Sequence, residues 1–227
     1  MKKTKQLVII GAGETAQIAF EYFSVDSEYD VVGFAVDRQF ITTPSIAGLP
    51  VISLDELELV FSPVNCWAFV AASSTKLNRV RSHLYTLVKN KNYRMANYIS
   101  SKAFLWRNTQ IGENCFIFED NTIQPFVKIG NNVVLWSGNH IGHNSTIQDN
   151  CFLASHVVVS GFCDVGESSF LGVNSTVIDN INIGKNCFIG AGALIQKDIP
   201  SGSVLQESST EASKVSSFRL FKIGDGR

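Results

Sequence analysis

The segment IGNNVV-LWSGNH-IGHNST-IQDNCF-LASHVV, residues 129–158, decides the fold, because every sixth residue in it is a branched aliphatic. Extended in both directions, the step of six finds Ile, Leu or Val at all seventeen positions from Ile99 to Ile195, and it fails at Tyr93 and Ser201. A strict period of six is neither the 3.6 of an α-helix nor the alternation of a simple strand. It indicates a β-solenoid, in which short strands stack coil upon coil.

The other positions of the repeat carry residues that suit tight corners and a narrow interior. Asn is frequent three residues after the aliphatic position, and Asn tolerates the left-handed backbone of a corner. Four residues after it the side chain is uncharged and mostly small. Four cysteines occupy that position: Cys115, Cys151, Cys163 and Cys187. We therefore interpret them as inward core residues, not as zinc ligands or nucleophiles.

Residues 1–97 follow a different pattern, in which apolar strand-like runs alternate with helix-like segments. Strands are predicted over 6–10, 29–37, 66–72 and 94–99, and helices over 14–23 and 76–88. This alternation is typical of a small Rossmann-like α/β domain with a parallel sheet. The predicted organisation is an α/β domain at 1–97, a solenoid at 98–200 and a C-terminal tail at 201–227.

A glycine-containing turn follows the first predicted strand and opens the first predicted helix. Gly11 and Gly13 lie in GAGETA, residues 11–16, where N–H groups at a helix N-terminus bind phosphate. Asp37 ends the second strand, where an acidic residue meets a ribose hydroxyl. A domain of about a hundred residues is too small for both halves of a dinucleotide fold, so a nucleoside diphosphate is favoured over NAD.

Charge and composition argue against several classes of protein. Lys and Arg number 19 against 20 Asp and Glu, so no basic surface for nucleic acid or an anionic membrane is indicated. Only four apolar residues, 7–10, follow the basic start, too few for a signal peptide or a membrane span. Five cysteines, an odd number, suit a reducing compartment. The predicted location is the cytoplasm.

The repeat resembles that of the hexapeptide-repeat acyltransferases. The resemblance implies a left-handed parallel β-helix with three repeats, or 18 residues, per triangular coil; general crossover rules would give the opposite hand. With that coil, one outward column is mostly phenylalanine: Phe116, Val134, Phe152, Phe170 and Phe188. Such an apolar strip is expected to be covered. We expect a homotrimer interface there, in preference to cover by the N-terminal domain.

Three of the four histidines cluster in the solenoid, at His140, His143 and His156. His143 lies two residues after an aliphatic position, at a corner from which its side chain projects. One coil further on lies Gly161, which leaves room for a substrate and bare N–H groups for an oxyanion. Imidazole titrates near neutral pH, so His143 suits a general base in acyl transfer. His140 and His156 are candidate substrate contacts.

Nearly the whole chain resembles the sugar acetyltransferases that join a nucleotide-sugar domain to such a β-helix. These include enzymes that N-acetylate nucleotide-linked amino sugars and the sialic acid O-acetyltransferase subfamily. The resemblance rests on GAGETA with Asp37, and on the segments IGHNSTI (141–147), FLGVNSTV (170–177) and IGAGALI (189–195). It implies an acetyl-CoA-dependent N-acetyltransferase that acts by direct attack on the thioester, as a homotrimer, in the synthesis of surface polysaccharide or glycan.

The same resemblance assigns roles to individual residues. It makes His143 the base, and Asn144 stands where the family commonly has a Glu that orients and charges the imidazole. Ser73, in the nucleotide-sugar site, stands where the family often has Gly. Acetyl-CoA would lie in a groove between neighbouring β-helices, matched here by Gly161, Gly190 and Ala191. No metal is expected.

Three other functions stay open at this point. The first is O-acetylation of a sugar with the same fold and base. The second is a zinc enzyme like the γ-carbonic anhydrases, which use three histidines on the same fold; the nucleotide-binding half and the histidine spacing argue against it. The third is a non-catalytic solenoid that acts as a binding scaffold.

Overall fold

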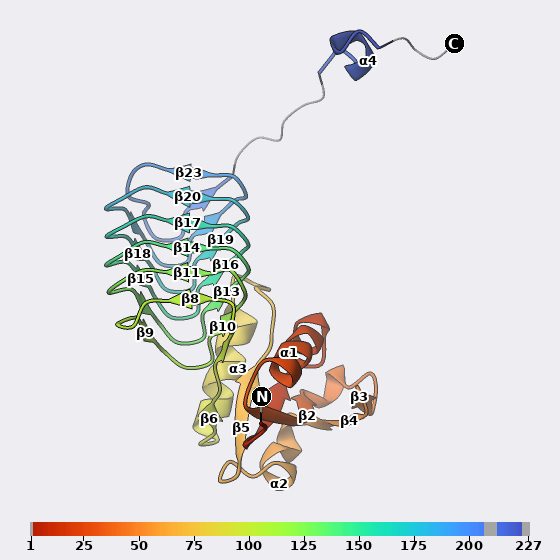
Figure 1. The fold of residues 1–227 in the computed structure, drawn as a ribbon. Helices are drawn as coiled ribbons and strands as arrows, with labels where there is room; N and C mark the ends of the chain where they lie inside the picture. Colours follow the sequence, from red (N-terminus) through yellow and green to blue (C-terminus); the bar gives the residue numbers. More distant parts are fainter. Residues whose placement is uncertain (1, 207–212, 224–227) are drawn as a thin grey trace.

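The N-terminal domain is built on one mostly parallel sheet (Figure 1). The computed structural model describes residues 2–206 and 213–223. The strand order is β3-β4-β2-β1-β5-β6. The strands are β1 (Lys5–Ile10), β2 (Tyr29–Val36), β3 (Ser45–Ile46), β4 (Leu49–Ser53), β5 (Cys66–Val70) and β6 (Arg94–Met95). Only β3 is antiparallel. The predicted α/β class is confirmed, and β3 and β4 are additions to it.

Two long helices accompany this sheet, with short turns of helix between strands. The helices are α1 (Glu14–Val25), η1 (Arg38–Phe40), η2 (Leu54–Glu56), α2 (Leu57–Val60) and α3 (Arg79–Asn90). Helix α1 buries Ala16, Ala19 and Phe23, which the helical period places on one face. Helix α3 begins later than predicted, because residues 76–78 adopt left-handed backbone with φ of 52° to 65°.

Three parallel sheets form the sides of a left-handed β-helix, above the N-terminal domain in Figure 1. The phenylalanine face consists of β7 (Tyr98–Ile99), β10 (Phe116–Ile117), β13 (Val134–Leu135), β16 (Phe152–Leu153), β19 (Phe170–Leu171), β22 (Phe188–Ile189) and β24 (Val204–Leu205). The histidine face consists of β8 (Phe104–Leu105), β11 (Thr122–Ile123), β14 (His140–Ile141), β17 (Val158–Val159), β20 (Thr176–Val177) and β23 (Leu194–Ile195). The third face consists of β9 (Gln110–Ile111), β12 (Lys128–Ile129), β15 (Thr146–Ile147), β18 (Asp164–Val165) and β21 (Asn182–Ile183).

Each two-residue strand places one side chain outward and its aliphatic partner in the core. Ile141, for example, pairs with Ile123 on one side and Val159 on the other, and all three are fully buried. The four repeat cysteines are buried as predicted. Burial raises the pKa of the Cys115 and Cys151 thiols to about 12, so these thiols stay protonated and unreactive at neutral pH.

The last coil departs from the period. Ile199 bridges Ile183, and Asp198 accepts from Asn182 N, so this coil steps by 16 residues instead of 18. The stack then continues to β24, which pairs with β22 past the predicted boundary at 200. Within the predicted tail, α4 covers Ser217–Leu220, whereas 207–212 and 224–227 lie outside the described residues.

The phenylalanine face meets the N-terminal domain. Phe116 and Val134 are buried, and the Tyr22 ring of α1 packs edge-on against Phe116 at 6.0 Å and against Phe118 at 4.8 Å. The prediction that this column forms the homotrimer interface is therefore wrong for Phe116 and Val134. Their cover is the α/β domain of the same chain, because α1 presents an aromatic side chain that matches them.

Arg81 ties α3 to the β-helix. Its side chain is 1% exposed, and its guanidinium donates to the carbonyl oxygens of Asn150 and Cys151, each at 3.0 Å. The Arg81 Cζ also lies 5.7 Å from the centre of the Phe152 ring. Burial lowers the pKa of Arg81 to about 10, so the group still carries its charge at neutral pH. Two of its nitrogens, Nε and Nη1, have no partner among the described residues.

Candidate active site

His143 stands on an exposed corner between the histidine face and the third face. It lies two residues past the end of β14, and its backbone N–H donates to the Gln124 Oε1 at 2.9 Å. Its ring meets the ring of Phe162 edge-on, with centres 5.0 Å apart. Phe162 is 55% exposed and has φ of 57°, a left-handed backbone that a bulky residue adopts at a cost. An aromatic ring therefore stands beside the imidazole at a corner position that Asn occupies in other coils.

Asn144 contacts the imidazole of His143. Its amide Nδ2 lies 3.1 Å from the His143 Nδ1. An amide nitrogen donates to Nδ1 and leaves the ring proton on Nε2, whereas an amide oxygen would accept from Nδ1–H and leave Nε2 free to take a proton. The orientation of the Asn144 amide thus selects the tautomer, without the negative charge of a carboxylate.

Gly161 lies next to the imidazole on the following coil. A Cβ on Gly161 would lie 2.9 Å from the His143 Cε1 and 3.0 Å from Nε2, so any side chain there would collide with the ring. The Gly161 N–H, however, is not bare, since it donates to the Asp179 Oδ1 at 2.8 Å. The expectation of a free N–H for an oxyanion is wrong at this residue, because a carboxylate already accepts from it.

The other predicted β-helix residues border the same face. His140 is the outward residue of β14, between Thr122 and Val158. His156 lies on the opposite corner of that face, stacked over Gly138, where a Cβ would come 2.5 Å from the His156 Nδ1.

Two of the residues predicted to bind acetyl-CoA, Gly190 and Ala191, follow β22 on the corner that carries His156. Gly161 lies instead on the corner that carries His143. The predicted acetyl-CoA residues are therefore divided between two corners, with the histidine face between them.

In the N-terminal domain, one cavity of about 370 Å³ brings together Gly11, Gly13, Asp37 and Ser73. The cavity lies at the carboxyl ends of β1, β2 and β5. The strand order reverses at β1, and ligands of open α/β sheets usually bind beside such a reversal. Gly11 has φ of +130°, and a Cβ there would come 2.6 Å from the Ala71 oxygen. Gly13 caps α1 without a side-chain hydrogen bond and has open space around it.

Sequence reasoning missed two residues that line this cavity, Phe40 and His83. Phe40, in η1 just after Asp37, is 58% exposed. His83 belongs to α3, where Val80 and Leu84 line the same cavity. Val80, His83 and Leu84 stand at i, i+3 and i+4 of a helix, a spacing that places the three side chains on one helical face. That spacing was the signal in the sequence that could have pointed to His83.

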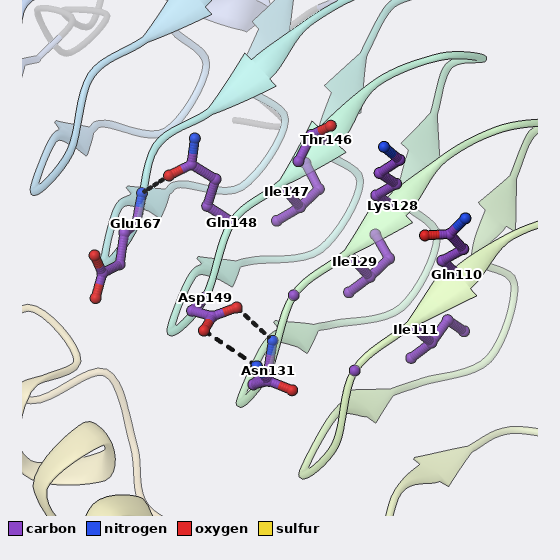
Figure 2. A pocket seen from close by; sticks show the side chains of 12 residues that line it. Gln110, Ile111, Lys128, Ile129, Asn131, Thr146, Ile147, Gln148, Asp149 and Glu167 are labelled. Atoms are coloured by element: carbon purple, nitrogen blue, oxygen red, sulfur yellow. Dashed lines mark hydrogen bonds between the residues drawn. The ribbon is translucent and has the colours of Figure 1, made fainter.

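A larger groove of about 560 Å³ runs along the third face (Figure 2). Its polar residues bind one another: Asp149 accepts from Asn131 N at 2.7 Å, and Gln148 accepts from Glu167 N at 3.3 Å. None of the predicted site residues lines it. These contacts close the corners of successive coils, so the size of the groove follows from the shape of the β-helix.

The described residues contain neither a metal site nor a membrane-spanning helix. Residues 2–206 and 213–223 contain no group of three or more His, Cys, Asp or Glu side chains placed to hold a metal ion. In the same ranges no helix is both long and apolar enough to cross a membrane.

The six-residue repeat matches the model of a known family. Residues 108–139, 127–161 and 162–197 match the family model of the bacterial transferase hexapeptide (six repeats). The β-helix is therefore similar to the bacterial transferase hexapeptide repeats. No curated protein matches the chain significantly.

Solved structures resemble the hexapeptide domain together with its α/β partner. A variant of perosamine N-acetyltransferase from Caulobacter crescentus, in complex with CoA and GDP-perosamine, is 24% identical with a TM-score of 0.78, over 88% of this chain and 92% of that one. The acetyltransferase domain of PglB from Neisseria gonorrhoeae, in complex with acetyl coenzyme A, is 22% identical with a TM-score of 0.78, over 88% and 95%. WeeI from Acinetobacter baumannii is 19% identical with a TM-score of 0.66, over 89% and 97%. At these identities the similarity establishes the two-domain fold.

Proposed function

We propose that the protein transfers the acetyl group of acetyl-CoA to the amino group of a nucleotide-linked sugar. One observation carries the proposal: a single chain joins a nucleotide-sized cavity to a hexapeptide domain with an exposed imidazole next to a glycine. The structural relatives support it, since perosamine N-acetyltransferase was crystallised with CoA and GDP-perosamine. The direct test is thiol release from acetyl-CoA with a panel of nucleotide-linked amino sugars. If no member of the panel is acetylated, the proposal fails.

The N-terminal cavity is the proposed nucleotide site. The uncapped start of α1 at Gly13 offers N–H groups and the positive end of a helix dipole to the phosphates. Asp37 would accept from a ribose hydroxyl. Phe40 presents an exposed ring on which a base can stack. Ser73, at the end of β5, supplies a hydroxyl to the same cavity.

His143 is the proposed general base. Its Nε2 takes a proton from the acceptor nitrogen, which then attacks the thioester carbonyl; the C–N bond forms and the C–S bond breaks. Nε2 returns the proton to the departing sulfur, so coenzyme A leaves as the thiol. For Nε2 to take that proton, the Asn144 amide has to turn so that its oxygen accepts from the Nδ1–H, in place of the amide nitrogen that lies 3.1 Å from Nδ1. His140 and His156 are proposed to contact substrate from the same face, and Gly161, Gly190 and Ala191 to contact acetyl-CoA.

Gly13→Val tests the proposed nucleotide site in the N-terminal domain. Open space around Gly13 lets the domain fold with the larger residue, but the new side chain lies in the path of the phosphates. We expect KM for the nucleotide sugar to rise by about tenfold or more, since close backbone approach is lost. Acetyl-CoA affinity, measured by calorimetry, should stay within about twofold. Equal losses for both ligands would contradict a separate nucleotide site.

A homotrimer is proposed, with its interface on the histidine face. The N-terminal domain buries Phe116 and Val134 of the phenylalanine face, whereas large apolar side chains stand exposed on and beside the histidine face: Phe104, Trp106, Phe126, Phe162 and Leu194. Apolar groups gathered in this way usually mark a contact surface. We also place the reaction in surface polysaccharide or glycan synthesis in the cytoplasm.

The trimer is tested by sedimentation. Wild-type protein should sediment at roughly 75 kDa, three chains of 24.9 kDa. Phe104→Glu combined with Leu194→Glu should give monomers, because both charges would be buried at the interface. Leu59→Glu is the matched control: Leu59 is 86% exposed in the N-terminal domain and its replacement should leave the trimer intact. A wild-type monomer at micromolar concentration would refute this assembly.

A further inference from the structure

We propose that Asp179 selects an amine as the acceptor, by binding its protonated form beside the His143 Nε2. This inference rests on the proposed function and deepens it. The two residues flank the same glycine: a Cβ on Gly161 would lie 3.0 Å from the His143 Nε2 and 3.3 Å from the Asp179 Oδ1. The surface over Gly161 is therefore bordered by an imidazole nitrogen on one side and a carboxylate on the other.

The hydrogen bond from the Gly161 N–H at the corner does not by itself explain why residue 179 is a carboxylate. At other corners a side-chain oxygen also accepts from a backbone N–H one coil away, and neutral amides do this at Asn108 and Gln124. The hydrogen bond from the Gly161 N–H thus requires an oxygen and no charge.

Asp179 also differs from Asp149 and Asp198, two aspartates that likewise accept from a backbone N–H of the preceding coil. Asp149 accepts from Asn131 N and, with its second oxygen, from the Asn131 side-chain amide at 3.2 Å. Asp198 does the same with Asn182, at 2.8 Å and 3.4 Å. The residue capped by Asp179 is a glycine, which has no side chain to bind the second oxygen. Within residues 2–206 and 213–223, the Asp179 Oδ2 has no hydrogen-bond donor and the carboxylate no ion-pair partner.

An amino sugar presents the cation that fits this oxygen. An aliphatic amine with a pKa of about 8 is mostly ammonium at pH 7. A carboxylate binds ammonium by a charge-assisted hydrogen bond but gains much less from a hydroxyl. The ammonium, held by Asp179, loses one proton to the His143 Nε2, which passes it to solvent. The neutral amine attacks, and the second proton reaches the departing thiolate through the same nitrogen, so one proton is released per turnover.

The test compares Asp179→Asn with wild type, because Asn keeps the oxygen that caps the Gly161 N–H and removes only the charge. Binding is measured by calorimetry at pH 7 for a nucleotide-linked amino sugar and for the same compound with a hydroxyl in place of the amine. Wild type should bind the amine about three- to tenfold more tightly, the range of a solvent-accessible ion pair. Asp179→Asn should lose that preference, with KM for the amine raised by the same factor and kcat within about twofold. Asp149→Asn, which alters the same kind of cap away from His143, should behave like wild type.

Three results would overturn the inference while leaving the proposed function intact. The first is equal binding of the two compounds by a wild-type enzyme that acetylates the amine. The second is an Asp179→Asn variant that keeps the amine preference. The third is loss of kcat and of both affinities together in Asp179→Asn, since that is the signature of a structural cap. Absence of any acetylation by wild type would overturn the proposed function itself.

Discussion

Replacing His143 with Ala is expected to lower kcat by about 10²–10⁴ while leaving ligand binding and assembly intact, because that is the usual contribution of a general base. The side chain is exposed on its corner and takes no part in the core, so its loss should not disturb the fold. The measurement is steady-state acetylation at pH 7, followed by thiol release. A His143→Ala enzyme with more than half of the wild-type kcat would reject His143 as the base.

Two neighbouring substitutions serve as controls for that result. Asn144→Ala removes the group 3.1 Å from the His143 Nδ1, and we expect a loss of about tenfold, because the ring stays but its orientation and tautomer are no longer held. His140→Ala should cost less than His143→Ala, since His140 lies on the strand before the corner. If His140→Ala were the most damaging of the three, the base would have to be reassigned.

Arg81→Ala is expected to destabilise the protein by about 2–4 kcal/mol, because it removes the guanidinium that donates to the Asn150 and Cys151 carbonyl oxygens and opens a cavity; the Cys151 oxygen keeps only its bond from Val134 N. The measurement is urea unfolding of the whole chain, followed by tryptophan fluorescence. The change should also reach the β-helix, since α3 packs on it through this side chain.

Arg81→Met is the matched control. Methionine fills most of the volume without bringing a charge into the interior, and replacing buried ionic groups by apolar ones is often close to neutral. We therefore expect Arg81→Met to be clearly more stable than Arg81→Ala. Equal unfolding midpoints for Arg81→Ala and wild type would show that the contact between α3 and the β-helix contributes nothing.

The six-residue period predicted the β-helix almost residue by residue, because position in the repeat dictates whether a side chain faces inward, outward or toward a corner. Its handedness required the resemblance to a family. The period could not show that the last coil is two residues shorter, since aliphatic residues at 199 and 205 resume the pattern only after a shift. Nor could it say what covers the phenylalanine column, because an outward apolar side chain is compatible with any apolar partner.

The sequence likewise predicted some residues of the candidate sites and not others. The meeting of Gly11, Gly13, Asp37 and Ser73 at one cavity could be predicted, because the ends of neighbouring parallel strands converge at one edge of a sheet. Asp179 was not singled out, since it lies 36 positions from His143 and only the stacking of three coils brings it near. A bare amide at Gly161 was expected for the same reason: the hydrogen bond that occupies it comes from another coil.

The shortened last coil also bears on how the molecule ends. A stack of equal coils has no intrinsic length, and its final edge exposes N–H and C=O groups to which another molecule could add a further coil. The step of 16 residues removes two residues from the corner between Ile195 and Ile199, while Ile199 still pairs with Ile183 and Leu205 with Ile189. On the third face the last coil adds only the single bridge at Ile199, so that edge presents less than a full two-residue strand to an incoming coil. The irregularity thus weakens the edge on which this β-helix could grow into end-to-end filaments.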